Sequence, residues 1–154
     1  MHRREEKFSV NASPDELWNF IRDFESLCAC IPGVERINQV DEMSLEVTVK
    51  EKIGIVPLIV DLTAQVESED PPHRLRGVAT AKHLDMEMDV SLQGIGTGTE
   101  ITAQFGVAGK GPLKPIVDRL FERRATERAA EFAQILEERF GADLKRSVPA
   151  DAGG

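Results

Sequence analysis

The feature that most constrains the fold is a long amphipathic segment from Pro115 to Phe140. Pro115 suits the first turn of a helix, and Gly141 suits a C-terminal cap. A helix of this length, about 39 Å at roughly 1.5 Å per residue, needs a broad apolar surface to lie on. Its own apolar residues recur every three or four positions, the spacing of one helix face: Val117, Phe121, Ala125, Ala129, Phe132, Leu136 and Phe140.

The middle of the chain supplies that surface. Apolar and polar residues alternate in one stretch after another, which predicts strands with one dry and one wet face. Turn residues separate the stretches at intervals of about ten residues, typical of an antiparallel meander. A short strand at Lys7–Val10 precedes them. The six stretches are residues 34–40, 45–53, 58–67, 74–82, 86–93 and 100–107.

Two short helices are expected between the first strand and the meander. Ser13 is a good N-cap, Pro14 fits the first helical position, and Glu16 completes a capping box. This helix runs to about Arg22, and a second covers residues 25–30. The sequence therefore predicts an α+β domain over residues 1–144: a seven-stranded curved antiparallel sheet gripping a long C-terminal helix. Residues 145–154 read as a flexible tail.

Composition excludes several classes of protein. The net charge of −8 argues against binding nucleic acid, which requires a basic surface. No run approaches the roughly 20 apolar residues of a membrane span, so no integral membrane segment is expected. The N-terminus has no apolar signal-peptide region, which favours the cytoplasm. Cys28 and Cys30 are too close in sequence for a good disulfide and lack partners for a zinc site, so reduced thiols, with no metal and no cofactor, are expected.

Three stretches carry a resemblance to a known family. They are residues 13–18 continuing through Asp23 to residues 30–35, residues 98–101, and residues 107–113. The layout resembles the helix-grip superfamily, also called Bet v 1/START-like or SRPBCC. Within it, these stretches look like the CoxG family, the G-subunit family of carbon monoxide dehydrogenase. The resemblance implies an apolar cavity between sheet and helix. It also implies association with a molybdenum-containing dehydrogenase, in maturation, membrane recruitment or handling of a lipophilic molecule.

Small residues on the expected inner surfaces agree with a cavity. Gly77, Ala79 and Ala81 alternate on one strand, while Ala125 and Ala129 form the middle of the helix stripe. Such residues indicate either a close approach of helix and sheet or an unfilled space. We expect residues 54–57, 83–85 and 107–112 to form the mouth. The predicted ligand-binding residues are Phe20, Phe24, Leu27, Val49, Leu58, Val60, Ala79, Ala81, His83, Met86, Met88, Phe105, Val117, Leu120, Phe121 and Arg124.

No motif in the sequence indicates catalysis. Nucleophile elbow, zinc-protease, P-loop and dinucleotide-binding patterns are missing, and the chain has no tyrosine. Only His83 and Arg124 are plausible titratable groups for a cavity. The favoured hypothesis is a non-enzymatic accessory protein that binds a hydrophobic or amphipathic molecule, lipid- or quinone-like. A small cyclase or hydratase-like enzyme and a protein-binding maturation factor with a filled core are the alternatives. Peripheral membrane contact and a homodimer stay open.

Overall fold

The order of elements follows the prediction. The structure, a computed structural model, describes residues 1–53 and 55–141. The expected tail at residues 145–154 lies outside them. The elements are β1 (His2–Val10), α1 (Pro14–Arg22), α2 (Phe24–Ala29), β2 (Val34–Asp41), β3 (Ser44–Ile53), β4 (Val56–Asp70), β5 (Arg74–Thr80), β6 (Leu84–Ile95), β7 (Gly98–Gly109), the short 3-10 helix η1 (Gly111–Leu113) and α3 (Lys114–Phe140).

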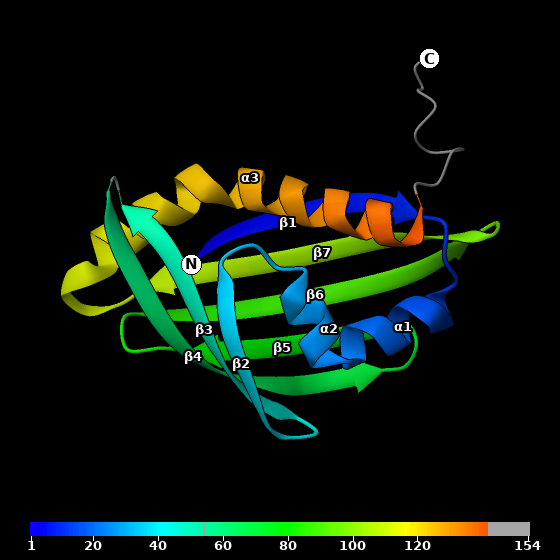
Figure 1. Cartoon of the computed structure of the whole chain (residues 1–154), viewed down its shortest axis with the longest axis horizontal. Coiled ribbons are helices and arrows are strands. Elements are labelled where there is room, and N and C mark those ends of the chain that lie inside the picture. Colours follow the sequence, from blue (N-terminus) through cyan, green and yellow to red (C-terminus); the bar gives the residue numbers. More distant parts are fainter. Residues whose placement is uncertain (54, 142–154) are drawn as a thin grey trace, which may run out of the picture.

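The strands form one antiparallel sheet in the order β1-β7-β6-β5-β4-β3-β2. Strands β2 to β7 follow one another as a meander, while β1, the first in sequence, pairs with β7, the last. The sheet curls so that β2, β3 and β4 rise toward the viewer in Figure 1, and all three α-helices lie on its concave side. This is the predicted α+β architecture, with two short helices after the first strand and a long C-terminal helix.

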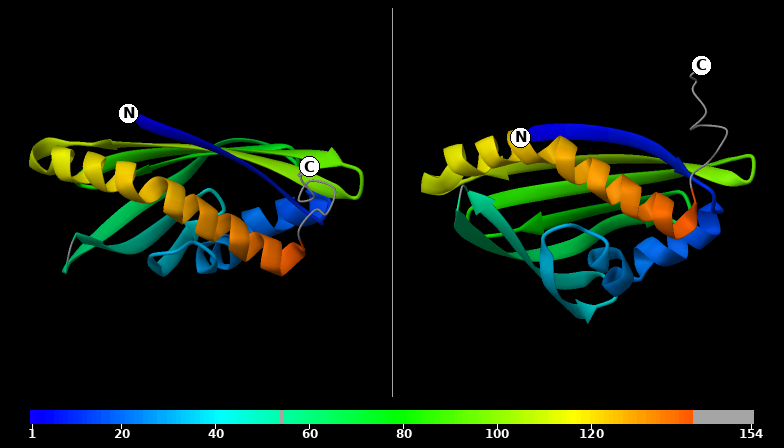
Figure 2. Two further views of the ribbon diagram at one scale, coloured as in Figure 1. Left: turned by 90° about the horizontal axis from the view of Figure 1, so that it is seen from above. Right: turned by 45° about the horizontal axis from the view of Figure 1, so that its top comes forward.

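The position of α3 differs from the sequence interpretation. The helix packs chiefly against β1 and β7, at one side of the sheet, and Figure 2 shows it running along β1. Strand β5, with Gly77 and Ala79, is two places away from β7 in the sheet. The helix therefore does not lie chiefly over the strand that carries the small residues Gly77 and Ala79. On this helix, Ala125 is 4% exposed, so its small side chain is buried.

One end of the molecule is closed by a packed core. Ser13 caps α1, its Oγ accepting a hydrogen bond from the Glu16 amide at 3.2 Å. The ring of Phe20 on α1 meets that of Phe140 on α3 edge to face, with centroids 5.2 Å apart. The buried residues of this cluster are Val10, Ala12, Leu17, Trp18, Phe20, Ile21, Cys30, Leu92, Ile101 and Leu136. The N- and C-terminal parts of the fold are thus joined at this end.

Candidate functional site

The central concave face of the sheet is apolar and partly uncovered. Met88 of β6 pairs with Phe105 of β7, whose ring contacts Phe121 of α3. Directly paired residues share a face, so Met88 points to the helix side, yet it is 41% exposed. A Cβ atom added to the neighbouring Gly77 would meet only the Gln65 carbonyl oxygen, at 3.3 Å. We call Gly77, Ala79, Met86 and Met88 the concave floor.

On one side, the concave floor is bounded by α3 and β7. The rings of Phe105 and Phe121 pack edge to face, with centroids 5.9 Å apart and planes at 81°. Val117, one turn before Phe121, is 5% exposed and belongs to the same apolar cluster as Met86. Leu120 is half-buried. These side chains form an apolar wall beside a partly open floor.

On the other side, the floor continues into the raised part of the sheet. Val49 of β3 pairs with Val60 of β4, and both are half-buried. Leu58 is also half-buried and lies two residues farther along the same face of β4. From α2, Phe24 is buried in the cluster that includes Val49, Val60, Ala79, Ala81 and Met86, and Leu27 packs against it. The second wall is therefore apolar as well.

A polar opening lies where α3 approaches the raised strands. Its cavity measures about 480 Å³. Arg128 of α3 donates two hydrogen bonds to Glu51 of β3, from Nε to Oε2 at 3.0 Å and from Nη2 to Oε1 at 2.7 Å. Arg124, one turn earlier, donates from Nη1 to Glu127 at 3.2 Å. We call this the mouth cavity; its lining residues are Gly33, Val34, Glu35, Lys50, Glu51, Lys52, Arg124 and Arg128.

The structure brings most of the predicted site residues together. The second apolar cluster and its partly buried neighbours include Phe24, Leu27, Val49, Val60, Ala79, Ala81, Met86, Val117 and Phe121. Phe105 joins this group through its contact with Phe121, and Met88 and Leu58 through their strand partners. Whether these residues bind a ligand stays a prediction.

Three predictions about the site need comment. Phe20 is 7% exposed and packs in the closed-end cluster, so it lies apart from the concave floor. His83 lies in the turn between β5 and β6, where its carbonyl oxygen accepts a hydrogen bond from the Lys110 amide. The mouth cavity is lined by residues 33–35 and 50–52 with α3, rather than by the expected segments 83–85 and 107–112; Gly54, from the third expected segment, lies outside the described residues.

Sequence reasoning missed Glu51 and the contact of Arg128 with it. Glu51 continues the inward alternation of Leu45, Val47 and Val49 on β3, so a carboxylate stands on an otherwise apolar face. Arg128 follows Phe121 and Arg124 at helical spacing. Both signals are present in the sequence. A charge at an apolar position of a strand, matched by an opposite charge on the facing helix, predicts a pair across the interior.

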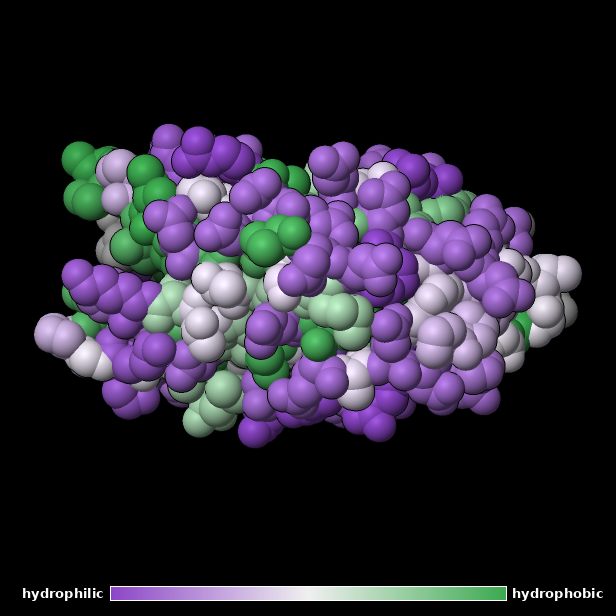
Figure 3. All heavy atoms as spheres, turned by 90° about the horizontal axis from the view of Figure 1, so that it is seen from below, coloured by the Kyte–Doolittle hydropathy of each residue, from purple (hydrophilic) through white to green (hydrophobic). Residues whose placement is uncertain are grey.

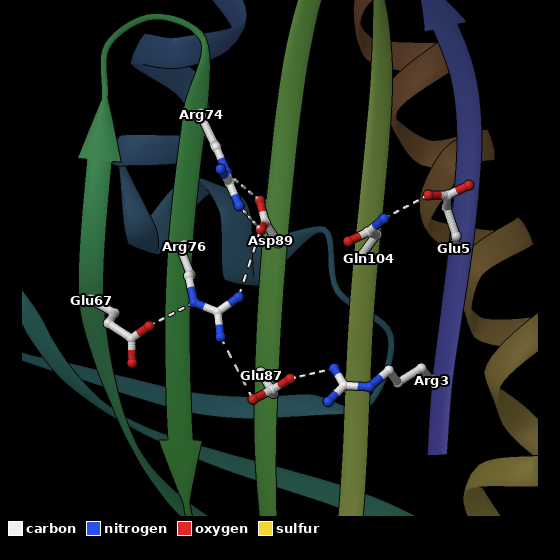
Figure 4. A network of polar contacts seen from close by, with 8 residues as sticks. All are labelled: Arg3, Glu5, Glu67, Arg74, Arg76, Glu87, Asp89 and Gln104. Carbon is white, nitrogen blue, oxygen red and sulfur yellow. Dashed lines mark hydrogen bonds and ion pairs between the residues drawn. The ribbon is translucent and has the colours of Figure 1, made fainter. Parts of the chain in front are cut away.

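The opposite, convex face carries a network of ion pairs (Figure 4). Arg76 of β5 contacts Glu67 of β4 and both Glu87 and Asp89 of β6. The Arg74 guanidinium bonds Asp89 with Nε to Oδ1 at 2.9 Å and holds the pKa of that carboxyl below its usual value. Other pairs join Arg3 to Glu87 and Gln104 to Glu5. The carboxylates of Glu87 and Asp89 are therefore engaged by arginines on the outer face, away from the concave floor.

The two thiols are free and buried. Burial raises the pKa of Cys28 to about 11, so its reactive thiolate form is scarce at neutral pH. Within residues 1–53 and 55–141, no group of three or more His, Cys, Asp or Glu side chains is arranged to hold a metal ion. Among the described helices, none combines the length and apolar character that crossing a bilayer requires.

Known structures identify the fold. A START superfamily protein from Mycobacterium smegmatis is 19% identical, with a TM-score of 0.69 over 91% of this chain and 97% of that one. A conserved protein from Geobacillus kaustophilus is 17% identical, with a TM-score of 0.77 over 90% of this chain and 94% of that one. An aromatase/cyclase from a Streptomyces species is 11% identical, with a TM-score of 0.62 over 88% of this chain and 94% of that one. The fold is therefore the START-like helix-grip fold.

A family model narrows the assignment. The model of CoxG, the G-subunit family of carbon monoxide dehydrogenase, matches residues 7–141, nearly the whole described chain. This chain belongs to the CoxG family. The comparison with curated proteins gave no match.

Proposed function

We propose that this protein binds a hydrophobic or amphipathic small molecule, of lipid or quinone type, on the concave side of its sheet without transforming it. The protein would serve a carbon monoxide dehydrogenase-type molybdoenzyme system from the cytoplasm. Membership of the CoxG family supports the link to that enzyme system. The START-like fold supports a binding role, because sites in such folds are concave and mostly apolar.

One observation carries the proposal. Met88 is 41% exposed although it points to the helix side, and nothing but a backbone oxygen lies near the position of a Gly77 side chain. A filled core would cover both positions, since protein interiors are close-packed. Exposed apolar surface on a concave face is a feature of ligand-binding grooves.

The experiment compares two valine substitutions on the same strand. Gly77→Val places a side chain on the concave floor, whereas Thr80→Val only replaces a hydroxyl with a methyl group on the opposite, solvent-facing side of β5. A neutral fluorescent probe, N-phenyl-1-naphthylamine, should bind the wild type and the Thr80 variant alike. Gly77→Val should weaken binding by about tenfold, because the new side chain occupies the ligand's volume. Circular dichroism verifies folding, and equal binding by both variants would contradict this site.

An enzymatic role is the alternative, because an aromatase/cyclase shares the fold. Fold similarity at 11% identity does not transfer an activity. In the proposed site, the charged groups Arg124, Arg128 and Glu51 stand at the mouth, and the concave floor consists of Gly77, Ala79, Met86 and Met88. A cyclase would need an acid or base beside its substrate. Recovery of a bound molecule unchanged in mass after long incubation supports binding over catalysis; a shifted mass would favour the enzyme.

We also propose that the β3–β4 hairpin makes peripheral contact with a membrane. Ile55, Val56 and Ile59 are 94%, 61% and 60% exposed, and apolar atoms gather at the end of the molecule that holds this hairpin (Figure 3). Exposed Lys50 and Lys52 precede them on β3. Ile55→Asp should abolish flotation with vesicles containing anionic lipid. Val40→Asp, at a position 60% exposed on β2, is the matched control and should float like the wild type.

A further inference from the structure

The mouth cavity differs in charge from the rest of the molecule. The whole chain has a net charge of −8, yet α3 brings two arginines, Arg124 and Arg128, to this cavity. Lys50 and Lys52 also line it, but they alternate with the inward Glu51 on β3, so their side chains lie on the other face of the strand. The helix side of the cavity is therefore basic on an acidic protein. Such a local field favours a negatively charged group over a neutral or positive one.

Arg124 and Arg128 of α3 both line the mouth cavity and can donate guanidinium hydrogen bonds there. Arg124 uses one N–H on Glu127, and a guanidinium has five. Arg128 is held by Glu51 and also donates to Glu131 at 3.1 Å. Only 31% of the Arg128 side chain and 16% of the Glu51 side chain are exposed. A carboxylate of a ligand could accept the free donors of Arg124 and compete with Glu51 for those of Arg128.

The residues of the mouth cavity adjoin those of the apolar site. Glu51 lies two residues beyond Val49 on the same face of β3, and Val34, which lines the cavity, packs against the cluster that contains Phe121. Arg124 follows Phe121 by three residues on α3, one helical turn. A molecule with its chain on the concave floor can therefore place one end at the arginines.

From this arrangement we infer that the mouth cavity binds the acidic head group of an amphipathic ligand, a carboxylate on a long apolar chain. The inference rests on the proposed function, since the chain of the ligand lies on the concave floor. Arg124 is the primary donor to the head group. Glu51 is a competing anion that occupies Arg128 in the unliganded protein and gives up its hydrogen bonds when the acid binds.

The test uses cis-parinaric acid and its methyl ester, two fluorescent probes with one apolar chain and different heads. The acid should bind about five- to tenfold more tightly than the ester, because charge-assisted hydrogen bonds form only with the carboxylate. Arg124→Gln should remove most of that preference and leave the ester unchanged. Glu51→Gln should strengthen binding of the acid several-fold, because it removes the competing charge from Arg128.

Arg123→Gln is the matched control, since it removes the same charge from an exposed position beside the cavity-lining Arg124. It should change neither probe. Equal affinity for acid and ester, with no effect of Arg124→Gln, would overturn the head-group assignment and leave the binding function standing. Binding of neither probe would overturn both. If Glu51→Gln fails to fold, Arg124→Gln still decides the question, because its partner is the exposed Glu127.

Discussion

The carboxylate of Glu51 accepts two hydrogen bonds from the guanidinium of Arg128, joining β3 to α3 across the concave side of the sheet. The two residues are 77 positions apart in sequence. Helix α3 otherwise packs chiefly on β1 and β7, at the opposite edge of the sheet order from β3. This pair therefore holds the raised strands to the helix.

A double-mutant cycle on this pair should show strong coupling. Glu51→Gln and Arg128→Gln should each lower the free energy of unfolding by about 1–2 kcal/mol, because each leaves a half-buried partner without its hydrogen bonds. The double variant should lose less than the sum, with a coupling energy of about 1 kcal/mol. Urea denaturation of the four proteins measures it. Additive losses would mean that the pair does not tether the helix.

Much of the fold could be predicted because apolar residues recur with two clear periods, one typical of helices and one typical of strands. The three- and four-residue spacing from Val117 to Phe140 predicted α3, and the structure places its start within one residue of the expected position. Alternation predicted the meander. Ser13 predicted the start of α1, and its side chain does cap that helix. These signals are local, because each depends only on residues close together in the sequence.

The placement of α3 over the sheet could not be predicted in the same way. Ala125 and Ala129 indicated either a close approach or an unfilled space, but alternation gives no information on which strand a helix approaches. In the structure, β1 pairs with β7, and the helix packs chiefly on these two strands. Glu51 was predictable in principle, because its parity follows Val49. Its partner, however, depends on the distance between two elements far apart in sequence.

The close approach of α3 to the sheet predicts a large effect at Ala125. This residue is 4% exposed, so Ala125→Leu should lower the free energy of unfolding by about 1–3 kcal/mol through overpacking. The matched change Ala130→Leu lies on the exposed side of the same helix and should stay within about 0.5 kcal/mol of the wild type. Thermal and urea denaturation test both variants. Tolerance of leucine at Ala125 would indicate spare volume beneath the helix.

The Arg74–Asp89 pair predicts an acid-sensitive contribution to stability. Hydrogen bonding to Arg74 lowers the pKa of Asp89 from the ordinary value of 3.8. A carboxyl with a lowered folded-state pKa stabilises the protein above the unfolded pKa, and this contribution is lost as the pH falls through the folded value. Asp89→Asn should therefore be less stable than wild type at about pH 6, and the difference should shrink below about pH 4. Urea midpoints across this range measure it; a difference that grew on acidification would contradict the assignment.

Burial of Cys28 predicts a thiol that resists alkylation in the folded protein. With its pKa raised to about 11, only about one thiol in a thousand is ionised at about pH 8, whereas an ordinary cysteine near pKa 8.5 is about one quarter ionised. In a Cys30→Ala background, iodoacetamide should therefore modify Cys28 at least about a hundredfold more slowly than in guanidinium. Mass spectrometry over time gives both rates. A folded-state rate within a few-fold of the denatured rate would show that Cys28 is accessible and ionised, and that α2 does not bury it against the sheet.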